Sequence, residues 1–369
     1  MLRDVFILGG ARTPFAAWKR GRTGFGARGG DYAARHPSEL ASAVCRAALE
    51  RCGVRAADAD RLIFGNMYPI GPHACYGGRY VSLRAGLPPE VPSLAMNMAC
   101  GTGLAALIQS AREIACGDAE LSLCVGADCP SLVDKEIFGP SFYDEECGSE
   151  IGATVEALAA ERGIDAAAMD AWALESHLRA KRAKAVAREE IVAFGGLALD
   201  DSVLENPAAV SFANAKRLYG GGISGRNTHA IVDGAAALVL GAQRPDGALG
   251  RFVDGASVGV EPARMGLASV PAIRALLKKT GKTIADIDLF EINETFAAQV
   301  LMDIGELQIP PEKVNVNGGA IAFGHPFAAT GGKLVLGLLL ELRRRKLRTG
   351  IAAICVGGGI GVAVLVERL

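Results

Sequence analysis

The chain has 369 residues, 50% of them hydrophobic and 21% charged, which excludes a mainly disordered or collagen-like protein. At roughly 150 residues per domain, this length corresponds to two or three packed units. Its 39 basic and 40 acidic residues give a net charge of -1, so the chain has no basic excess with which to bind nucleic acid through bulk charge.

Short β-type runs alternate with helical stretches in the first third of the chain. In chain order we predict a strand at 5–8, a helix from 38 to about 52 that Ser38 caps, a strand at 61–64, a helix at 103–116 and a strand at 121–125. The last four of these elements are each followed directly by a glycine. This β-α-β-α order favours an α/β fold whose sheet is covered by helices on both faces.

The middle of the chain has little strand signal. We interpret 129–222 as an inserted helical domain, with helices at 149–162 and 170–188. The strand–helix pattern then returns, with strands at 236–240, 289–292, 351–356 and 362–366 and helices at 271–279 and 333–344. We therefore expect an N-terminal half at 1–128, completed by about 223–244, and a C-terminal half at 245–369.

The nine cysteines contain no C-x-x-C pair, and their number is odd, so we expect neither a zinc ribbon nor a disulfide framework. Five scattered histidines show no ligand spacing, and we expect no metal site. The N-terminal apolar run resembles a strand more than a signal peptide. No run of 18 apolar residues lacks polar or glycine interruptions, so we expect a cytoplasmic protein without a membrane-spanning helix.

Cys100 is a candidate nucleophile. It follows a short extended run and directly precedes the predicted helix at 103–116. Unpaired N–H groups and the positive dipole end at a helix N-terminus favour a thiolate, and Gly101 and Gly103 let a substrate carbonyl approach closely. The local sequence alone also permits a packed core cysteine.

Three further segments contain candidate chemical groups. His325 lies in a glycine-rich loop between a strand and a helix, where an imidazole can take a proton from a thiol, although a structural histidine or a phosphate-binding loop is also possible. Cys355 precedes three consecutive glycines whose N–H groups can hold an oxyanion or form a hairpin turn. Asn293 follows a predicted strand and also suits a helix cap.

Taken together, these segments resemble the thiolase family. N-x-x-C-G-x-G at 97–103, N-E-x-F-A at 293–297, G-G-x-I-A-x-G-H-P at 318–326 and C-x-G-G-G-x-G at 355–361 stand in the family's order and spacing. The resemblance spans nearly the whole chain. It implies an α/β fold of two similar five-stranded α-β-α-β-α halves with an inserted helical loop domain.

The resemblance also implies an activity and the residues that perform it. The activity is a CoA-dependent acyl transfer, in which acyl-CoA and acetyl-CoA interconvert with 3-ketoacyl-CoA and CoA, and CoA is a substrate rather than a bound cofactor. Cys100 would carry the acyl group, His325 would activate Cys100, and Cys355 would move a proton at the α-carbon. Asn293 would hold a water that, together with His325, binds one thioester oxygen. The N–H groups of Cys100 and Gly357 would bind the other oxygen.

Substrate recognition departs from the family pattern. His229 stands where thiolases carry a small serine beside the pantetheine arm, so it narrows the tunnel, bonds a pantetheine carbonyl in the serine's place, or faces solvent. Its imidazole, unlike a serine, can be cationic. Ile151 replaces a methionine of the loop domain, and we expect Ile151, Met265 and Phe296 to contact substrate as well. The motifs around His325 and Asn293 favour different thiolase subgroups, which leaves the acyl length open.

Other function classes make different demands on the sequence. A ketoacyl synthase lacks a second catalytic cysteine, which Cys355 argues against. A non-catalytic acyl-CoA or lipid carrier would have lost Cys100 or His325, and both are present. A redox-thiol protein would form a reversible disulfide, which thiol titration detects. The apolar composition and the resemblance favour a homodimer or tetramer.

Overall fold

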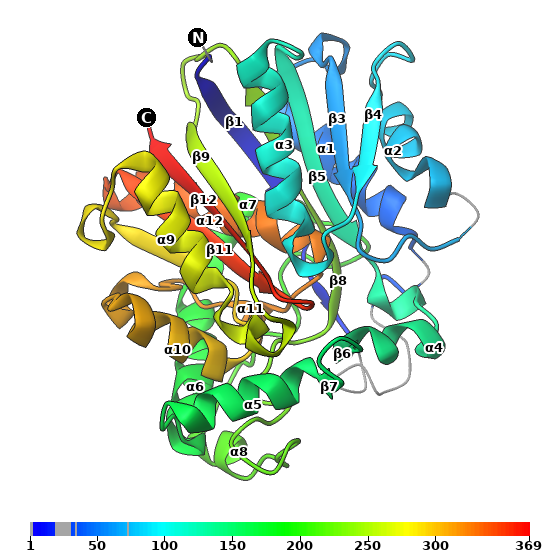
Figure 1. Cartoon of the computed structure of the whole chain (residues 1–369). Coiled ribbons are helices and arrows are strands. Elements are labelled where there is room, and N and C mark those ends of the chain that lie inside the picture. Colours follow the sequence, from blue (N-terminus) through cyan, green and yellow to red (C-terminus); the bar gives the residue numbers. More distant parts are fainter. Residues whose placement is uncertain (1–2, 19–30, 34, 72–73) are drawn as a thin grey trace.

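A computed structural model describes residues 3–18, 31–33, 35–71 and 74–369 (Figure 1). Its strands are β1 (Val5–Arg12), β2 (Ala16–Ala17), β3 (Arg61–Gly65), β4 (Ser93–Met96), β5 (Leu121–Asp128), β6 (Tyr143–Asp144), β7 (Ser149–Glu150), β8 (Val232–Gly241), β9 (Gly250–Gly259), β10 (Leu289–Ile292), β11 (Thr349–Val356) and β12 (Ile360–Arg368). Its α-helices are α1 (Pro37–Arg51), α2 (Gly77–Ala85), α3 (Thr102–Cys116), α4 (Lys135–Phe138), α5 (Ile151–Glu161), α6 (Ala166–Arg182), α7 (Lys184–Glu190), α8 (Ala209–Ala213), α9 (Ser269–Thr280), α10 (Ala297–Leu307), α11 (Ala320–Phe323) and α12 (Ala328–Arg345).

The main strands form one continuous sheet in the order β10-β11-β12-β9-β1-β8-β5-β3-β4, and β2 pairs with β8. The N-terminal half contributes β1, β8, β5, β3 and β4, and the C-terminal half contributes β9, β12, β11 and β10. The two halves join where β1 pairs antiparallel with β9. The α/β fold of two similar halves, predicted from the sequence, is therefore confirmed.

The C-terminal half lacks a full fifth strand. At its place beside β10, Val314 makes a single parallel bridge with Phe290. Two prolines, Pro310 and Pro311, precede this bridge without N–H groups for a ladder, and Asn315 follows it with a left-handed φ of 48°. These residues limit the pairing to one position.

Helices cover both faces of the sheet, and two of them lie between its two halves (Figure 1). α1 packs on β1, β5 and β8, whereas α9 packs on β9, β11 and β12. α3 and α12 contact each other and lie between the halves, because each also contacts strands of both halves. The arrangement is thus the α-β-α-β-α layering implied by the resemblance.

The two central helices approach closely because glycines line their contact. A Cβ on Gly103 would lie 2.4 Å from the carbonyl oxygen of Ala328, and one on Gly331 would lie 2.3 Å from the backbone nitrogen of Leu104. On β5, a Cβ on Gly126 would lie 1.9 Å from the Ala328 oxygen. Backbone therefore packs on backbone here, and a side chain larger than hydrogen cannot enter without moving α12.

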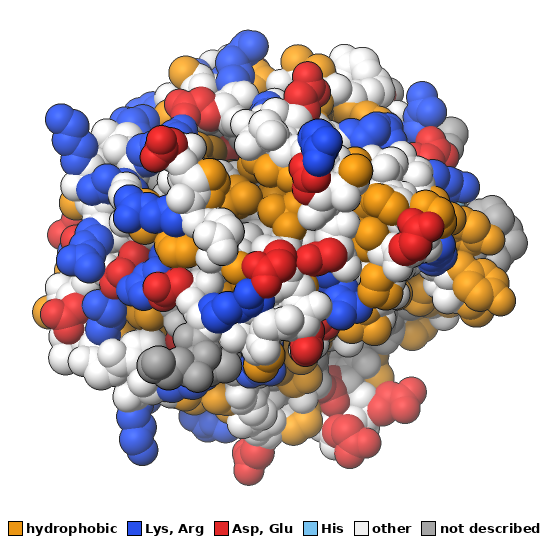
Figure 2. All heavy atoms as spheres, turned by 90° about the horizontal axis from the view of Figure 1, so that it is seen from above, with side chains coloured by type: hydrophobic (Ala, Val, Ile, Leu, Met, Phe, Trp, Pro, Cys, Tyr) orange, Lys and Arg blue, Asp and Glu red, His pale blue; other side chains and the backbone are white. Residues whose placement is uncertain are grey.

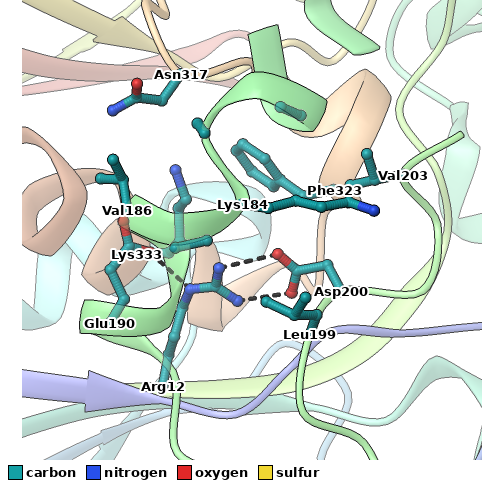
Figure 3. A pocket seen from close by; sticks show the side chains of 13 residues that line it. Arg12, Lys184, Val186, Glu190, Leu199, Asp200, Val203, Asn317, Phe323 and Lys333 are labelled. Atoms are coloured by element: carbon teal, nitrogen blue, oxygen red, sulfur yellow. Dashed lines mark hydrogen bonds and ion pairs between the residues drawn. The ribbon is translucent and has the colours of Figure 1, made fainter. Parts of the chain in front are cut away.

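A buried ion-pair cluster connects the segment between β5 and β8 to β1. Arg12 of β1 is 1% exposed and donates to Glu190 at the end of α7 (2.7 Å) and to Asp200 beyond it (2.7 and 2.9 Å), as Figure 3 shows. Lys333 of α12 lines the same small cavity, with its amine 4.0 Å from Glu291. Two carboxylates on one guanidinium satisfy most of its donors, which burial of a charge requires.

Several predicted boundaries are wrong for identifiable reasons. His36 rather than Ser38 caps α1, because its ring accepts from the Ser38 N–H and Glu39 bonds back to the His36 N–H. The helix predicted at 170–188 is divided at Ala183 into α6 and α7. β9 was not predicted, since its three glycines and Asp254 give little strand signal, and pairing with β12 and β1 supplies its order.

No helix among the described residues is long and apolar enough to cross a bilayer.

Gly126→Ala should destabilise the fold, because its Cβ would overlap the Ala328 backbone. Overpacking of this kind costs about 1–3 kcal/mol or more, and a urea titration measures the loss as a lower midpoint. Gly305→Ala is the matched control. Gly305 is exposed within α10 with no atom within 4 Å of its Cβ position, so this variant should gain about 0.5–1 kcal/mol. Equal midpoints for both variants would contradict the packing argument.

Candidate active site

Cys100 lies on a 3-10 turn (Ala99–Gly101) that runs directly into α3, so its predicted place before a helix is confirmed. The turn holds Ala99 at a left-handed φ of 44°. Asn97 Oδ1 accepts from the Ala99 N–H (2.8 Å), while Thr102 Oγ1 accepts from the Met98 N–H (2.8 Å) and donates to the Ala99 carbonyl (2.6 Å). These bonds fix a conformation that a non-glycine residue rarely adopts.

Burial controls the protonation of Cys100. Desolvation, together with the nearby Asp128 carboxylate, raises the pKa of its thiol to about 12. The backbone N–H groups of Cys100 and Gly357 oppose this rise. The expectation that the helix N-terminus yields a thiolate is therefore wrong for the resting protein, because loss of hydration outweighs the local dipole. Cys100 is a neutral thiol that needs a base.

His325 can supply that base. It precedes α12, and its Nδ1 lies 2.6 Å from Thr330 Oγ1. Burial, and then the neighbouring His229, hold the pKa of His325 well below its ordinary value, so the imidazole is neutral. In the tautomer that carries its hydrogen on Nδ1, that hydrogen is donated to Thr330 and the Nε2 lone pair is free. A general base requires this tautomer.

Asn293 and Cys355 stand at the ends of adjacent parallel strands. Asn293 follows β10, and Cys355 is the penultimate residue of β11. Burial raises the pKa of the Cys355 thiol above its ordinary value, and the Asp303 carboxylate adds to this rise. The carboxyl ends of parallel strands in an α/β fold are where ligands bind.

Three polar side-chain atoms near the ends of β10 and β11 are buried without a hydrogen-bond partner in the described structure: His229 Nε2, Asn293 Oδ1 and His325 Nε2. We call this region the junction. The rings of His229 and His325 are 5.0 Å apart, and both Asn293 and His229 bond to Thr295. Buried polar atoms are ordinarily paired, so a group of unpaired ones indicates a site for a polar ligand. Cys100 and Cys355 interact electrostatically, and Thr295 contacts Cys355 as well as Asn293, so the structure brings the four side chains that the sequence singled out as catalytic into one region.

A cavity of about 90 Å³ reaches this junction. Its lining includes His229, Ile151 and Phe296, three of the four predicted substrate contacts. Met265 is buried in the 3-10 helix Pro262–Leu267 and is not among the described residues that line the cavity. His229 is 4% exposed, so it does not face solvent, and burial lowers its pKa to about 4. The imidazole is neutral near pH 7, which corrects the cationic alternative.

Two structural residues of the site were missed from the sequence. Asp128 accepts from the N–H groups of Tyr68 (3.0 Å) and Ala328 (2.9 Å) and from Asn66 Nδ2 (2.7 Å), so it ties the end of β5 to the start of α12. Thr295 contacts both Asn293 and Cys355. No local signal identifies Asp128, because its partners come from distant segments, whereas Thr295 stands two residues after Asn293.

Comparison of the sequence with known protein families identifies the family of this chain. The model of the thiolase N-terminal domain matches residues 15–140, and that of the thiolase C-terminal domain matches residues 247–368. The chain belongs to the thiolase family. The resemblance inferred from the sequence is confirmed, and so is the prediction that this thiolase is a CoA-dependent acyltransferase.

The relatives of this thiolase include proteins named acetyl-CoA acetyltransferase and proteins named 3-ketoacyl-CoA thiolase. The chain is 34% identical to the acetyl-CoA acetyltransferase of Shinella zoogloeoides, covering 97% of this chain and 100% of the relative. It is 32% identical to the mitochondrial 3-ketoacyl-CoA thiolase of Bos taurus, covering 100% and 99%. The crystal structure of human mitochondrial 3-ketoacyl-CoA thiolase superposes with a TM-score of 0.93 at 30% identity and 99% coverage of both chains. A structure of that human enzyme in complex with CoA also matches, with a TM-score of 0.92.

The buried neutral His229 predicts a pH effect on stability. Its folded-state pKa of about 4 lies below the ordinary value of about 6.5, so the unfolded chain binds the proton first. The stabilisation is complete above pH 6.5 and is lost as the pH falls toward 4. Between pH 7 and pH 5 the wild type should lose about 2 kcal/mol of unfolding free energy relative to His229→Gln. Urea titrations at both pH values measure this difference.

His229→Asn also lacks a titrating group and serves as the control. It should differ from the wild type by the same pH-dependent amount as His229→Gln, whatever each variant costs at pH 7. A pH-independent difference between the wild type and both variants would contradict the depressed pKa.

Proposed function

We propose that this thiolase catalyses reversible Claisen condensation and thiolysis of 3-ketoacyl-CoA through an acyl-enzyme on Cys100. The observation that carries the proposal is the meeting of two buried thiols with three unpaired polar atoms at the start of α3 and α12 and the end of β11. A carrier needs none of these groups, and nothing in the comparisons favours a non-catalytic protein.

In the first step, His325 Nε2 takes the Cys100 proton while the sulfur attacks the thioester carbonyl. The new C–S bond forms a tetrahedral intermediate, whose oxyanion the N–H groups of Cys100 and Gly357 bind. Both N–H groups lie next to the Cys100 sulfur, which supports this assignment. The intermediate then expels CoA, which recovers the proton from His325. Donors fixed before the reaction are effective because no reorganisation is needed.

In the second step, the Cys355 thiol first gives its proton to His325 Nε2, which is neutral again once CoA has left, and the resulting thiolate takes a proton from the α-carbon of acetyl-CoA. The C–H electron pair becomes an enolate, which attacks the acyl carbon on Cys100 and releases that sulfur, and the sulfur takes the proton held by His325. Asn293 Oδ1, an unpaired acceptor, holds the water that, together with His325, binds the enolate oxygen. Thiolysis runs the same steps in reverse.

The pantetheine arm and acyl group occupy the cavity beside His229. Its neutral Nε2 bonds a pantetheine amide, while Ile151 and Phe296 supply apolar contact. Met265 is buried in the same core cluster as Ile151 and Phe296 and is proposed to act on substrate only through that packing. CoA is a substrate and product, and no additional cofactor is required.

The ends of three strands support the domain boundaries. We propose halves at 1–128 with about 223–244, and at 245–369, with a loop domain at 129–222, since β5 ends at Asp128, β8 begins at Val232 and β9 begins at Gly250.

The chemistry needs two reduced thiols, and all nine cysteines are free, which supports a reducing, cytoplasmic location of the protein.

The exposed edge strand β4 supports the proposal that the protein forms a homodimer, or a tetramer built from such dimers. β4 is the last strand of the sheet, and Leu94 on it is 44% exposed. An open, apolar edge strand favours pairing with another chain. Figure 2 shows hydrophobic side chains gathered on the side where Figure 1 places α2 and β4.

Thiolysis of a 3-ketoacyl-CoA chain-length series tests the function directly. The expected result is CoA-dependent loss of the thioester enolate absorbance with at least one member of the series, and the dependence on length identifies the acyl group. Absence of turnover with every member would refute the proposal.

Cys355→Ala should separate the two steps. It should still form an acyl adduct on Cys100 at about the wild-type rate, because acylation needs only Cys100 and His325. Condensation and thiolysis should fall by about 100-fold or more, since general acid–base catalysis contributes about 10²–10⁴-fold. Intact mass spectrometry detects the trapped adduct, and Cys100→Ala should form none.

Cys45→Ala is the matched control for removing a buried thiol. Cys45 is buried on α1, away from the site, so this variant should retain both steps even if it loses stability. A fully active Cys355→Ala enzyme would exclude Cys355 from proton transfer.

The edge-strand interface predicts that Leu94→Glu disrupts the oligomer. Sedimentation velocity at micromolar concentration should show at least a dimer for the wild type and a 38.2 kDa species for this variant, because a charge replaces an apolar contact. Val210→Glu changes a more exposed apolar residue (63%) on α8 and should leave the oligomer intact. A wild-type chain that sediments as a monomer would contradict the interface.

A further inference from the structure

Thr295 contacts three groups of the site at once. Its hydroxyl lies 3.4 Å from Cys355 Sγ and 3.1 Å from Asn293 Nδ2. Its carbonyl accepts from His229, whose ring Nδ1 is at 3.0 Å and whose backbone N–H is at 3.2 Å. Its own N–H donates to Gln299 Oε1 (3.1 Å). The backbone of Thr295 is therefore fixed on both sides, and only its hydroxyl hydrogen is free to choose a direction.

The hydrogen-bond chemistry determines that direction. An amide nitrogen has hydrogens but no lone pair to offer, so Asn293 donates to Thr295 Oγ1. The hydroxyl keeps its own hydrogen and a second lone pair, and the sulfur of Cys355 lies beside both. It can accept from the Cys355 thiol and, by rotating, donate to the Cys355 thiolate.

We propose that Thr295 is a positioning residue for Cys355, whose thiolate its hydroxyl stabilises by donating a hydrogen bond at the condensation step. The inference rests on the role of Cys355 proposed above. It assigns a function to a side chain that is not one of the four predicted catalytic residues.

The surroundings of Cys355 make such a donor necessary. The thiol is 1% exposed, so water cannot solvate its anion, and Asp303 and Cys100 are the titratable groups that face it. Asp303 is itself bonded to Gln299 Nε2 (2.6 Å) and Ser269 Oγ (2.6 Å), which anchors the residue that fixes the Thr295 backbone. Both facing groups disfavour a negative charge on sulfur, whereas the Thr295 hydroxyl favours it.

The size of the effect follows from hydrogen bonds to charged groups, whose loss changes an equilibrium by roughly 10- to 150-fold. Thr295→Val keeps the shape of the side chain and removes the hydroxyl. Condensation at neutral pH should slow by about this factor, and the rising limb of its pH profile should move about 1–2 units toward alkaline pH. Acylation of Cys100 by acyl-CoA should stay within about twofold of the wild type, with an unchanged pH profile.

Two further variants make the test specific. Thr295→Ser restores the hydroxyl and should return condensation to within about threefold of the wild type. Thr280→Val removes a hydroxyl that bonds the Leu276 carbonyl on α9, outside the site, and should leave both steps unchanged. If Thr295→Val does not fold, Thr295→Ala is compared with Thr295→Ser in the same assays.

The outcomes separate the inference from the proposed function. Condensation at wild-type rate without the hydroxyl overturns the inference, as does equal slowing of both steps with no pH shift, which is the result expected if Thr295 only orients Asn293. Failure of Thr295→Ser to rescue overturns it too. A wild-type protein that forms no acyl adduct on Cys100 refutes the proposed function, and the inference with it.

Discussion

The site depends on the close approach of α3 and α12. Gly103 and Gly331 let the two backbones touch, and Gly126 admits the Ala328 carbonyl against β5. Each helix begins beside one reactive side chain, Cys100 before α3 and His325 before α12. The contact between the helices therefore brings together two residues 225 positions apart in the chain, and Asp128 fixes the same junction by accepting from the Ala328 N–H.

Burial then determines what these groups do. Both thiols and both imidazoles of the site are neutral at pH 7, because desolvation shifts their pKa values toward the uncharged form. Charge must develop during the reaction, where fixed N–H donors can stabilise it better than they would in water. The same burial prevents either cysteine from being a free thiolate in the absence of substrate.

The sequence predicted the elements that carry local patterns. Cys100, His325 and Cys355 were identified because each stands beside glycines at a predicted element boundary, and the order of their motifs identified the fold. Properties that depend on packing were not predicted. The thiolate of Cys100 was inferred from a helix end, which is local, while its desolvation comes from distant segments. β9 was missed for the same reason, since its pairing partners leave no local periodicity. The cap at His36 is local, but its acceptor is an imidazole rather than one of the side chains that usually cap a helix.

The two thiols face the same difficulty and are served by different partners. Cys100 is proposed to lose its proton to the imidazole of His325, whose Nε2 has no hydrogen-bond partner in the described structure. Cys355 lies beside a hydroxyl that can stabilise the anion but cannot keep the proton. This difference matches the work proposed for each. A nucleophile that forms a covalent bond needs its proton taken away for the lifetime of the acyl-enzyme. A thiol that exchanges a proton with carbon must lose and regain it within one step, and a hydroxyl that donates to the anion and accepts from the thiol suits both states.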